Sequence, residues 1–155
     1  MPRLVKGGKY VYGWSEVASE GRIVIPDGAI ADYNLKLNSK IILLSGSRRS
    51  GGFALTTISL LKNSRLSSIL DENPRLTRFK LSKGETIRIA RRICCWVTLN
   101  TDGSIIVPSE TLKEYGVNIG SLLLSVRGSR LALGFCVKGP LIEEARNHSS
   151  LTLFK

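Results

Sequence analysis

Three cysteines and one histidine are the side chains best suited to nucleophilic or metal chemistry in this chain. Cys94 and Cys95 are adjacent, Cys136 stands alone, and His148 lies in a polar C-terminal stretch. A structural zinc site needs paired ligands such as Cys-x-x-Cys, and a catalytic triad needs a histidine beside a nucleophile. The sequence also has no clustered carboxylate pair and no phosphate-binding loop. We therefore expect reduced thiols, no metal, no cofactor, no catalytic residues and no small-molecule substrate.

The remaining candidates for function are the basic side chains, which are numerous in this sequence. The 155 residues include 23 Lys and Arg against 12 Asp and Glu, a formal net charge of +11. Such a charge favours a polyanionic partner, either nucleic acid or an anionic membrane surface. The alternative is adaptation to a basic, ribosome-rich or high-salt cell interior without any specific ligand.

The hydropathy of the sequence helps to decide between nucleic acid and a membrane as the partner. Hydrophobic residues make up 43% of the chain, which excludes disorder as its default state. No apolar run approaches the roughly 20 residues of a membrane span, and the start of the chain lacks the apolar segment of a signal peptide. We expect a cytoplasmic protein that has no membrane partner.

The elements that must position these charges come from an internal repeat. A shift of 82 positions superposes nine identical residues between 14 and 48. The identities include the pairs Trp14/Trp96, Gly21/Gly103, Ile23/Ile105, Pro26/Pro108 and Tyr33/Tyr115. After Arg48 the first copy carries four extra residues, and Phe53–Leu55 then resumes opposite Leu131–Leu133. Self-similarity of this kind indicates one structural unit used twice.

Each copy has the same predicted elements. A short β-rich run, 22–25 or 104–107, follows an acid-Gly turn and ends at a proline. A short helix comes next and ends at Asn34 or Gly116, the residue types that best tolerate a left-handed conformation. In the second copy Ser109 could cap this helix, or Pro108 could occupy its first position. Two further strands follow, at 41–44 and 53–55 or at 122–126 and 131–135.

The repeats divide the chain into five segments. We expect a basic arm at 1–13, repeats at 14–56 and 97–138, a basic insert at 57–96, and a C-terminal helix and tail at 139–155. The insert should contain an amphipathic helix over 60–70 and a helix or strand over 85–92. A helix over 139–146 and a loose tail or edge strand should end the chain. Four short strands cannot bury a face alone, so the two repeats should close one barrel.

The run Asp102–Pro108 with the helix and strand after it resembles the AbrB/MazE/SpoVT family of swapped-hairpin DNA-binding domains. The tandem layout with an insert resembles the two-repeat MraZ branch of that family, over roughly 14–146. The resemblance implies a mainly β fold with short helices, in which two swapped-hairpin repeats form one pseudo-symmetric barrel. It also implies duplex DNA as the partner, gene regulation and a homo-oligomer.

The sequence departs from this family at a hallmark. MraZ proteins carry Asp-x-x-x-Arg at the first turn of each repeat. Here the first copy, 18–22, keeps only the arginine, Arg22, and the second copy, 100–104, lacks both residues. The roles of MraZ at particular promoters are therefore not carried over.

Candidate DNA contacts come from the resemblance and from the position of charge. The resemblance points to Arg22 and Lys113, whose counterparts Ser104 and Ala31 are uncharged. The arm, the repeats and their turns add further basic residues: Lys6, Lys9, Lys36, Lys40, Arg48, Arg49, Arg127 and Arg130. We expect Arg48–Gly52 to form a flexible basic hairpin tip, which could bind phosphate or could simply be solvated.

Most of the excess charge lies outside the repeats. Residues 57–96 hold nine basic and three acidic residues. This insert could be the nucleic-acid face itself or a plain solvated surface, and Arg91–Arg92 could instead belong to an oligomer interface. The rival function is an antitoxin-like or scaffold module that binds a protein partner, although the tail at 147–155 offers only Leu151, Leu153 and Phe154 as apolar anchors.

Overall fold

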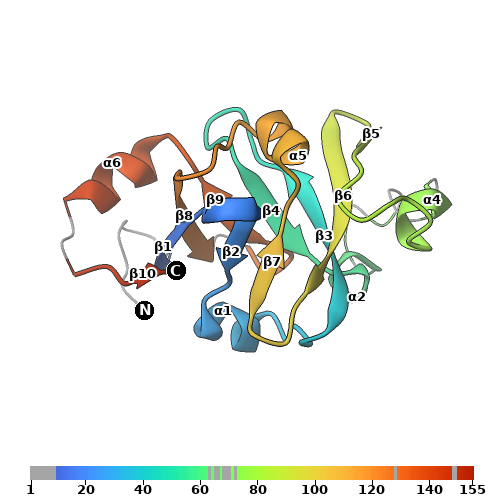
Figure 1. The fold of residues 1–155 in the computed structure, drawn as a ribbon, viewed down its shortest axis with the longest axis horizontal. Helices are drawn as coiled ribbons and strands as arrows, with labels where there is room; N and C mark the ends of the chain where they lie inside the picture. Colours follow the sequence, from blue (N-terminus) through green and yellow to red (C-terminus); the bar gives the residue numbers. More distant parts are fainter. Residues whose placement is uncertain are drawn as a thin grey trace.

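A mainly β architecture with short helices is what the chain adopts, as the sequence predicts (Figure 1). The structure is a computed structural model, and it describes residues 10–62, 64, 67, 71, 73–127, 129–147 and 150–155. Within these residues ten strands form one eight-stranded sheet and one two-stranded sheet.

The large sheet runs through the whole molecule. Its neighbours pair antiparallel, except that β10 is parallel to β1. The strands in spatial order are β10 (Leu153–Phe154), β1 (Tyr10–Glu16), β8 (Leu122–Arg127), β9 (Leu133–Cys136), β4 (Phe53–Thr56), β3 (Ser39–Ser45), β6 (Arg92–Leu99) and β5 (Ile87–Ile89).

The two-stranded sheet consists of β2 (Arg22–Val24) and β7 (Ser104–Ile106), the two runs expected after the acid-Gly turns. Ile23 lies directly opposite Ile105, and both side chains are fully buried. They belong to the same hydrophobic cluster as Leu43, Leu55 and other residues of the large sheet. The small sheet therefore packs across one face of the large one, as Figure 1 also shows.

The expectation of a closed barrel is wrong. The order of the large sheet has two ends, β10 and β5, and no pairing joins them among the described residues. β2 and β7 pair only with each other in that part of the chain. Each is three residues long. After one intervening residue comes Pro26 or Pro108, which has no N–H with which to extend a ladder.

Matching helices follow these prolines. α1 (Asp27–Asp32) and α5 (Ser109–Glu114) are each six residues long, with Pro26 and Pro108 at the N-cap. Ser109 is thus the first helical residue, and its side chain makes no capping hydrogen bond. Asn34 and Gly116 have φ of 52° and 74°, which confirms their predicted role at the helix ends.

The other face of the large sheet is covered by α2 (Ile58–Lys62), α4 (Pro74–Thr77) and α6 (Pro140–Arg146). α2 and α4 lie over β3 and β6, with Leu61 and Leu76 packed on Ile42 and Trp96. α6, the predicted C-terminal helix, lies over β1 and β8. The segment 85–92 forms β5 and the start of β6 rather than a helix. Residues 63, 65, 66 and 68–70 of the expected amphipathic helix lie outside the described residues.

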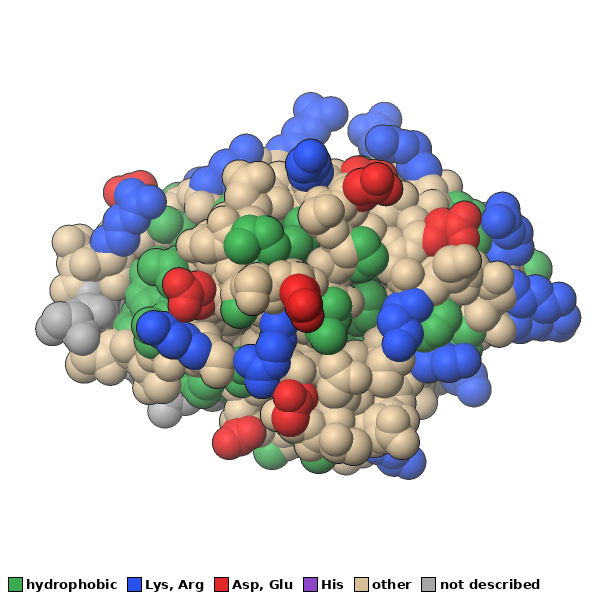
Figure 2. Space-filling view, viewed as in Figure 1, with side chains coloured by type: hydrophobic (Ala, Val, Ile, Leu, Met, Phe, Trp, Pro, Cys, Tyr) green, Lys and Arg blue, Asp and Glu red, His purple; other side chains and the backbone are tan. Residues whose placement is uncertain are grey.

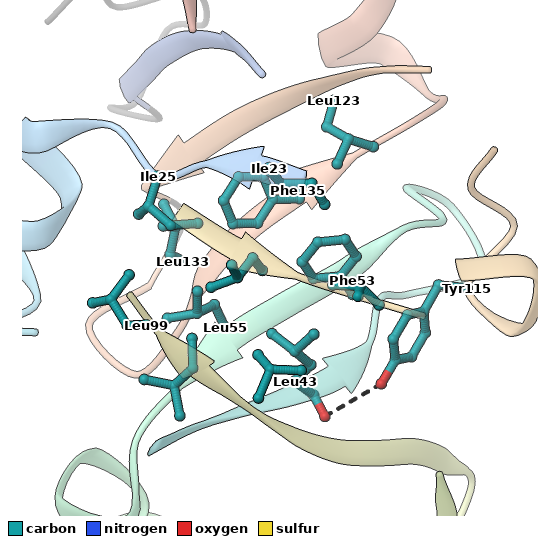
Figure 3. Close-up of a cluster of buried hydrophobic side chains, with 14 of the residues drawn as sticks. Ile23, Ile25, Leu43, Phe53, Leu55, Leu99, Tyr115, Leu123, Leu133 and Phe135 are labelled. Carbon is teal, nitrogen blue, oxygen red and sulfur yellow. Dashed lines mark hydrogen bonds between the residues drawn. The ribbon is translucent and has the colours of Figure 1, made fainter. Parts of the chain in front are cut away.

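β3, an interior strand of the large sheet, shows why both faces are covered. Along β3, Ile41 and Leu43 point into the inner cluster, whereas Ile42 and Leu44 point into the cluster under α2 and α4. This is the period of two that a pleated strand imposes. Figure 3 shows the inner cluster, where Phe53 and Phe135 stack at 5.1 Å and Tyr115 directs its hydroxyl to the Leu43 carbonyl.

Strand pairing crosses between the two halves of the sequence. β1 pairs with β8 and β6 pairs with β3, so Trp14 faces Leu124 while Trp96 faces Ile42. β4 pairs with β9, with Ala54 opposite Gly134. Neither half forms a separate sheet, and the 82-residue shift converts the first of these tryptophan pairings into the second.

Candidate nucleic-acid interface

Arg22, the arginine that matches the family hallmark, forms an ion pair with the other half of the chain. Its Nη2 lies 3.1 Å from Asp102 Oδ2, and the two side chains are 38% and 55% exposed. Asp102 belongs to the acid-Gly turn before β7, which β2–β7 pairing brings beside Arg22. Sequence reasoning missed this pairing because the two residues are 80 positions apart. The charge of Arg22 is therefore compensated within the molecule.

Asp102 is held as a carboxylate by several donors. The Ser104 hydroxyl and backbone N–H both donate to Oδ1, at 2.6 and 3.0 Å. The Ser104 hydroxyl bond, followed by the Arg22 hydrogen bond, lowers the pKa of Asp102 from 3.8 to about 2. Ser104, the uncharged counterpart of Arg22, thus orients the carboxylate that neutralises Arg22.

The other family-like candidate, Lys113, is exposed on α5. α5, the helix that carries Lys113, contacts the turn η1 (Ser19–Gly21). Glu20 and Glu110 lie on these two elements as well. Arg22 has an acidic partner, and the element that carries Lys113 also carries Glu110.

Arg127 is also compensated. Its Nη1 lies 3.6 Å from Asp32 Oδ2, and the Tyr12 hydroxyl donates to the same oxygen at 2.6 Å. Burial and then the Asp32 hydrogen bond raise the pKa of Tyr12 well above its usual range. Arg130, in the β8–β9 turn, is exposed and has no ion pair with a described carboxylate.

Lys40 lies against aromatic rings. Its Nζ is 4.9 Å from the ring centroid of Trp96 and 5.1 Å from that of Phe79. Trp96 is fixed in turn by its indole N–H, which donates to the Leu81 carbonyl at 2.7 Å. Lys40 thus joins β3 to the insert by a cation–π contact. Lys36 is exposed in the loop after α1, and Lys6 and Lys9 lie outside the described residues.

The β3–β4 turn, which carries Arg48 and Arg49, is tied to the rest of the fold by backbone hydrogen bonds. The Gly46 N–H donates to the Gly52 carbonyl, and the Ser50 carbonyl accepts from the N–H groups of Val137 and Lys138. A Cβ added at Gly52 would lie 2.0 Å from the Phe135 carbonyl oxygen. The turn therefore packs against the end of β9, and Arg48 and Arg49 are exposed on it.

Arg48 meets three arginines of the insert. Arg48, Arg88, Arg91 and Arg92 line one surface hollow of about 480 Å³, together with Ser45, Gly46 and Ala90. We call this the arginine hollow. No acidic residue lines it, and none of the four arginines has an ion pair with a carboxylate of the described chain. Antiparallel pairing of β3 with β6 and of β6 with β5 brings them together.

Basic side chains are also visible in the space-filling view. Figure 2 shows them along the edge above α5 and the β5–β6 hairpin, and around the end that α4 forms. The insert contributes Lys62, Arg75, Arg78, Lys80, Lys83, Arg88, Arg91 and Arg92 to the described surface, all exposed. None of these has an ion pair with a described carboxylate. The uncompensated charge therefore concentrates on the insert and the adjoining β3–β4 turn, which we call the insert-side surface.

The thiols are unsuited to chemistry. Cys94, Cys95 and Cys136 are all buried. Burial raises the pKa of Cys94 to about 12 and that of Cys95 to about 11. Within the described residues, no group of three His, Cys, Asp or Glu side chains could hold a metal ion.

No family model, curated protein or solved structure matches this chain. No helix in the described part of the chain has the length and apolar character needed to cross a membrane.

Proposed function

We propose that the two halves of the chain are copies of one swapped-hairpin unit related by a two-fold axis. The strand register supports this organisation. Ile23 and Ile105, which the 82-residue shift superposes, lie opposite each other. The order β1-β8-β9-β4-β3-β6 also reads the same from both ends when each strand is replaced by its counterpart. In this arrangement the first strand of each unit pairs with the third strand of the other.

This organisation agrees with the fold that the resemblance to the AbrB/MazE/SpoVT family implies. Because that family binds DNA, the resemblance also leads us to expect DNA binding. We infer that the protein binds duplex DNA and acts as a transcription regulator by occupying promoters, without chemistry. Such a protein would associate with the nucleoid and, like the family it resembles, act as a homo-oligomer in which repeated weak contacts add up.

The observation that carries the proposal is the distribution of uncompensated charge. Basic residues on the insert-side surface lack carboxylate partners, whereas Arg22 and Arg127 already have them. Each lysine or arginine placed on a DNA phosphate releases a condensed counterion, and this release supplies most of the affinity of weak DNA binders. The insert-side surface can therefore contribute more affinity than the hallmark turn. Phosphate contacts position a protein, and base contacts give it sequence preference.

Fluorescence anisotropy tests the proposal with duplex from the protein's own upstream region and with scrambled duplex, over a range of salt concentrations. We expect tight binding to the upstream duplex that persists at about 150 mM salt, where non-specific binding lies near 10⁻⁴–10⁻⁶ M. Equal, steeply salt-dependent binding to both duplexes would contradict a regulator. Absence of binding at low salt would contradict DNA binding altogether and would favour a protein partner.

A further inference from the structure

The arginine hollow gathers four like charges without a counterion from the described chain. Arg48 comes from the β3–β4 turn, Arg88 from β5, Arg91 from the β5–β6 turn and Arg92 from β6. Guanidinium groups stay charged at any physiological pH. Together they give the hollow a positive potential that attracts anions.

Backbone and side-chain contacts fix the walls of the hollow. The Ser45 hydroxyl accepts from the Ile93 N–H at 2.9 Å, and the Ser45 carbonyl accepts from Arg92 Nη1 at 3.4 Å. These bonds leave the other donors of Arg92 available. The β5–β6 turn is only two residues long, with Ala90 at φ 56°. A fixed framework lowers the entropy cost of binding a ligand.

The size of the hollow suits a phosphate-bearing group. A water molecule occupies about 30 Å³ in the liquid, so about 480 Å³ has room for several oxyanion groups and their bridging waters. The rigid fork of a guanidinium matches two oxygens of one phosphate, which makes arginine the preferred partner for bidentate recognition. The absence of an acidic lining residue leaves no local repulsion of an anion.

We propose that the arginine hollow is a specific binding site for a phosphate group. The phosphate could belong to the DNA backbone, in which case the site anchors the insert on the duplex, or to a free oligophosphate. Binding of a DNA phosphate depends on the proposed function, whereas binding of a free oligophosphate does not. Both sources share the same chemistry, and competition between them separates the two.

The test compares two double variants that lose the same charge. Arg88→Ala with Arg91→Ala removes two of the four arginine side chains that line the hollow. Arg75→Ala with Arg78→Ala removes two exposed arginines of α4 and its C-cap that do not line it. Circular dichroism melts show that each variant is folded. Titration calorimetry of the full chain then measures the affinity for inorganic tripolyphosphate.

We expect tripolyphosphate to bind the unaltered protein and the α4 variant with affinities within about twofold, and to bind the hollow variant at least tenfold more weakly. Equal loss in both double variants, or no binding to the unaltered protein, would overturn the proposal. If tripolyphosphate displaces duplex from the unaltered protein but not from the hollow variant, the hollow takes a backbone phosphate. Simultaneous binding would assign the hollow to a free oligophosphate. Tripolyphosphate binding without any DNA binding would refute the proposed function and leave the phosphate site standing.

Discussion

Arg22 and Asp102 lie 3.1 Å apart across the two-stranded sheet, so the arginine expected to face DNA is paired with a carboxylate of the same chain. The second repeat has no matching ion pair among the described residues. At the counterpart of Arg22 the second repeat has Ser104, which is buried and hydrogen-bonded to Asp102. The residue at this second position therefore supports the carboxylate that neutralises Arg22 and does not supply a second positive charge.

Removal of this acid should strengthen DNA binding. Asp102→Asn leaves Arg22 uncompensated, and we expect tighter binding to duplex with a salt slope steeper by about 0.9, the value for one added phosphate contact. Anisotropy titrations over a salt series measure both quantities. The matched control is Glu143→Gln, which removes an acid from α6, where it pairs with Arg146. An equal gain in the control would mean that net charge alone sets the affinity.

Asp102 should titrate near pH 2 in the folded protein. Its folded pKa lies below the ordinary value of 3.8, so its contribution to stability is complete above about pH 4 and is lost as the pH falls from about 4 to about 2. Carboxyl NMR titration measures this pKa. Ser104→Ala removes the largest cause and should raise the pKa, whereas Thr101→Ala, in the same exposed turn, should not. An unchanged value in Ser104→Ala would refute the assigned cause.

Lys40 should matter for stability. Because its ammonium lies over Trp96 and Phe79, Lys40→Ala should lower the free energy of unfolding by about 0.5–1 kcal/mol, the value of an exposed cation–π contact. Chemical denaturation measures the loss. Lys36→Ala, from an exposed loop, serves as the control and should unfold like the unaltered protein. Equal behaviour of the two variants would contradict a structural role for Lys40.

Two turns that border the arginine hollow should respond to substitution in opposite ways. Ala90 has a left-handed φ of 56°, which costs a residue with a Cβ about 1–2 kcal/mol. Ala90→Gly relieves this cost but increases the entropy of the unfolded chain, so we expect a net gain of less than about 1 kcal/mol. In contrast, Gly52→Ala would place a Cβ 2.0 Å from a carbonyl oxygen and should destabilise the fold markedly. Thermal melts that show the same sign for both changes would contradict the described turns.

The elements that were predictable from sequence are those set by local chemistry. The strands before Pro26 and Pro108 and the helix ends at Asn34 and Gly116 follow from proline and from left-handed backbone, which need no knowledge of distant residues. The repeat supplied a second, independent copy of each signal. This is why the mainly β character and the order of elements could be predicted.

Features that depend on strand pairing between distant segments could not be predicted. Arg48 and Arg88 are 40 positions apart and meet only because β3 pairs with β6 and β6 with β5. In the sequence alone, Arg88, Arg91 and Arg92 are indistinguishable from other charges on a solvated insert. The open sheet was missed for the same reason, since closure depends on which strands pair and not on how many there are.

Under the two-fold relation that we propose, alignment by residue identity also misplaces one element. The sequence pairs Phe53 with Leu131, but the register of β4 and β9 centres on Ala54 opposite Gly134. Under the proposed two-fold relation the counterpart of Phe53 is therefore Leu133. The β3–β4 and β8–β9 turns differ in length, and contacts such as those of Gly52 hold them. This difference shifts the alignment by two residues. A short apolar run in the sequence gives no sign of the shift.

The central claim is that this protein binds duplex DNA chiefly through its insert-side surface. Anisotropy at about 150 mM salt on the upstream duplex tests it most directly, with two double variants of equal charge: Arg48→Ala with Arg49→Ala, and Arg22→Ala with Lys113→Ala. We predict that the first pair loses at least tenfold in affinity, with a salt slope shallower by about 1.8 for two lost phosphate contacts, and that the second loses less than threefold. The reverse order would contradict the account and would return the DNA contact to the hallmark turn.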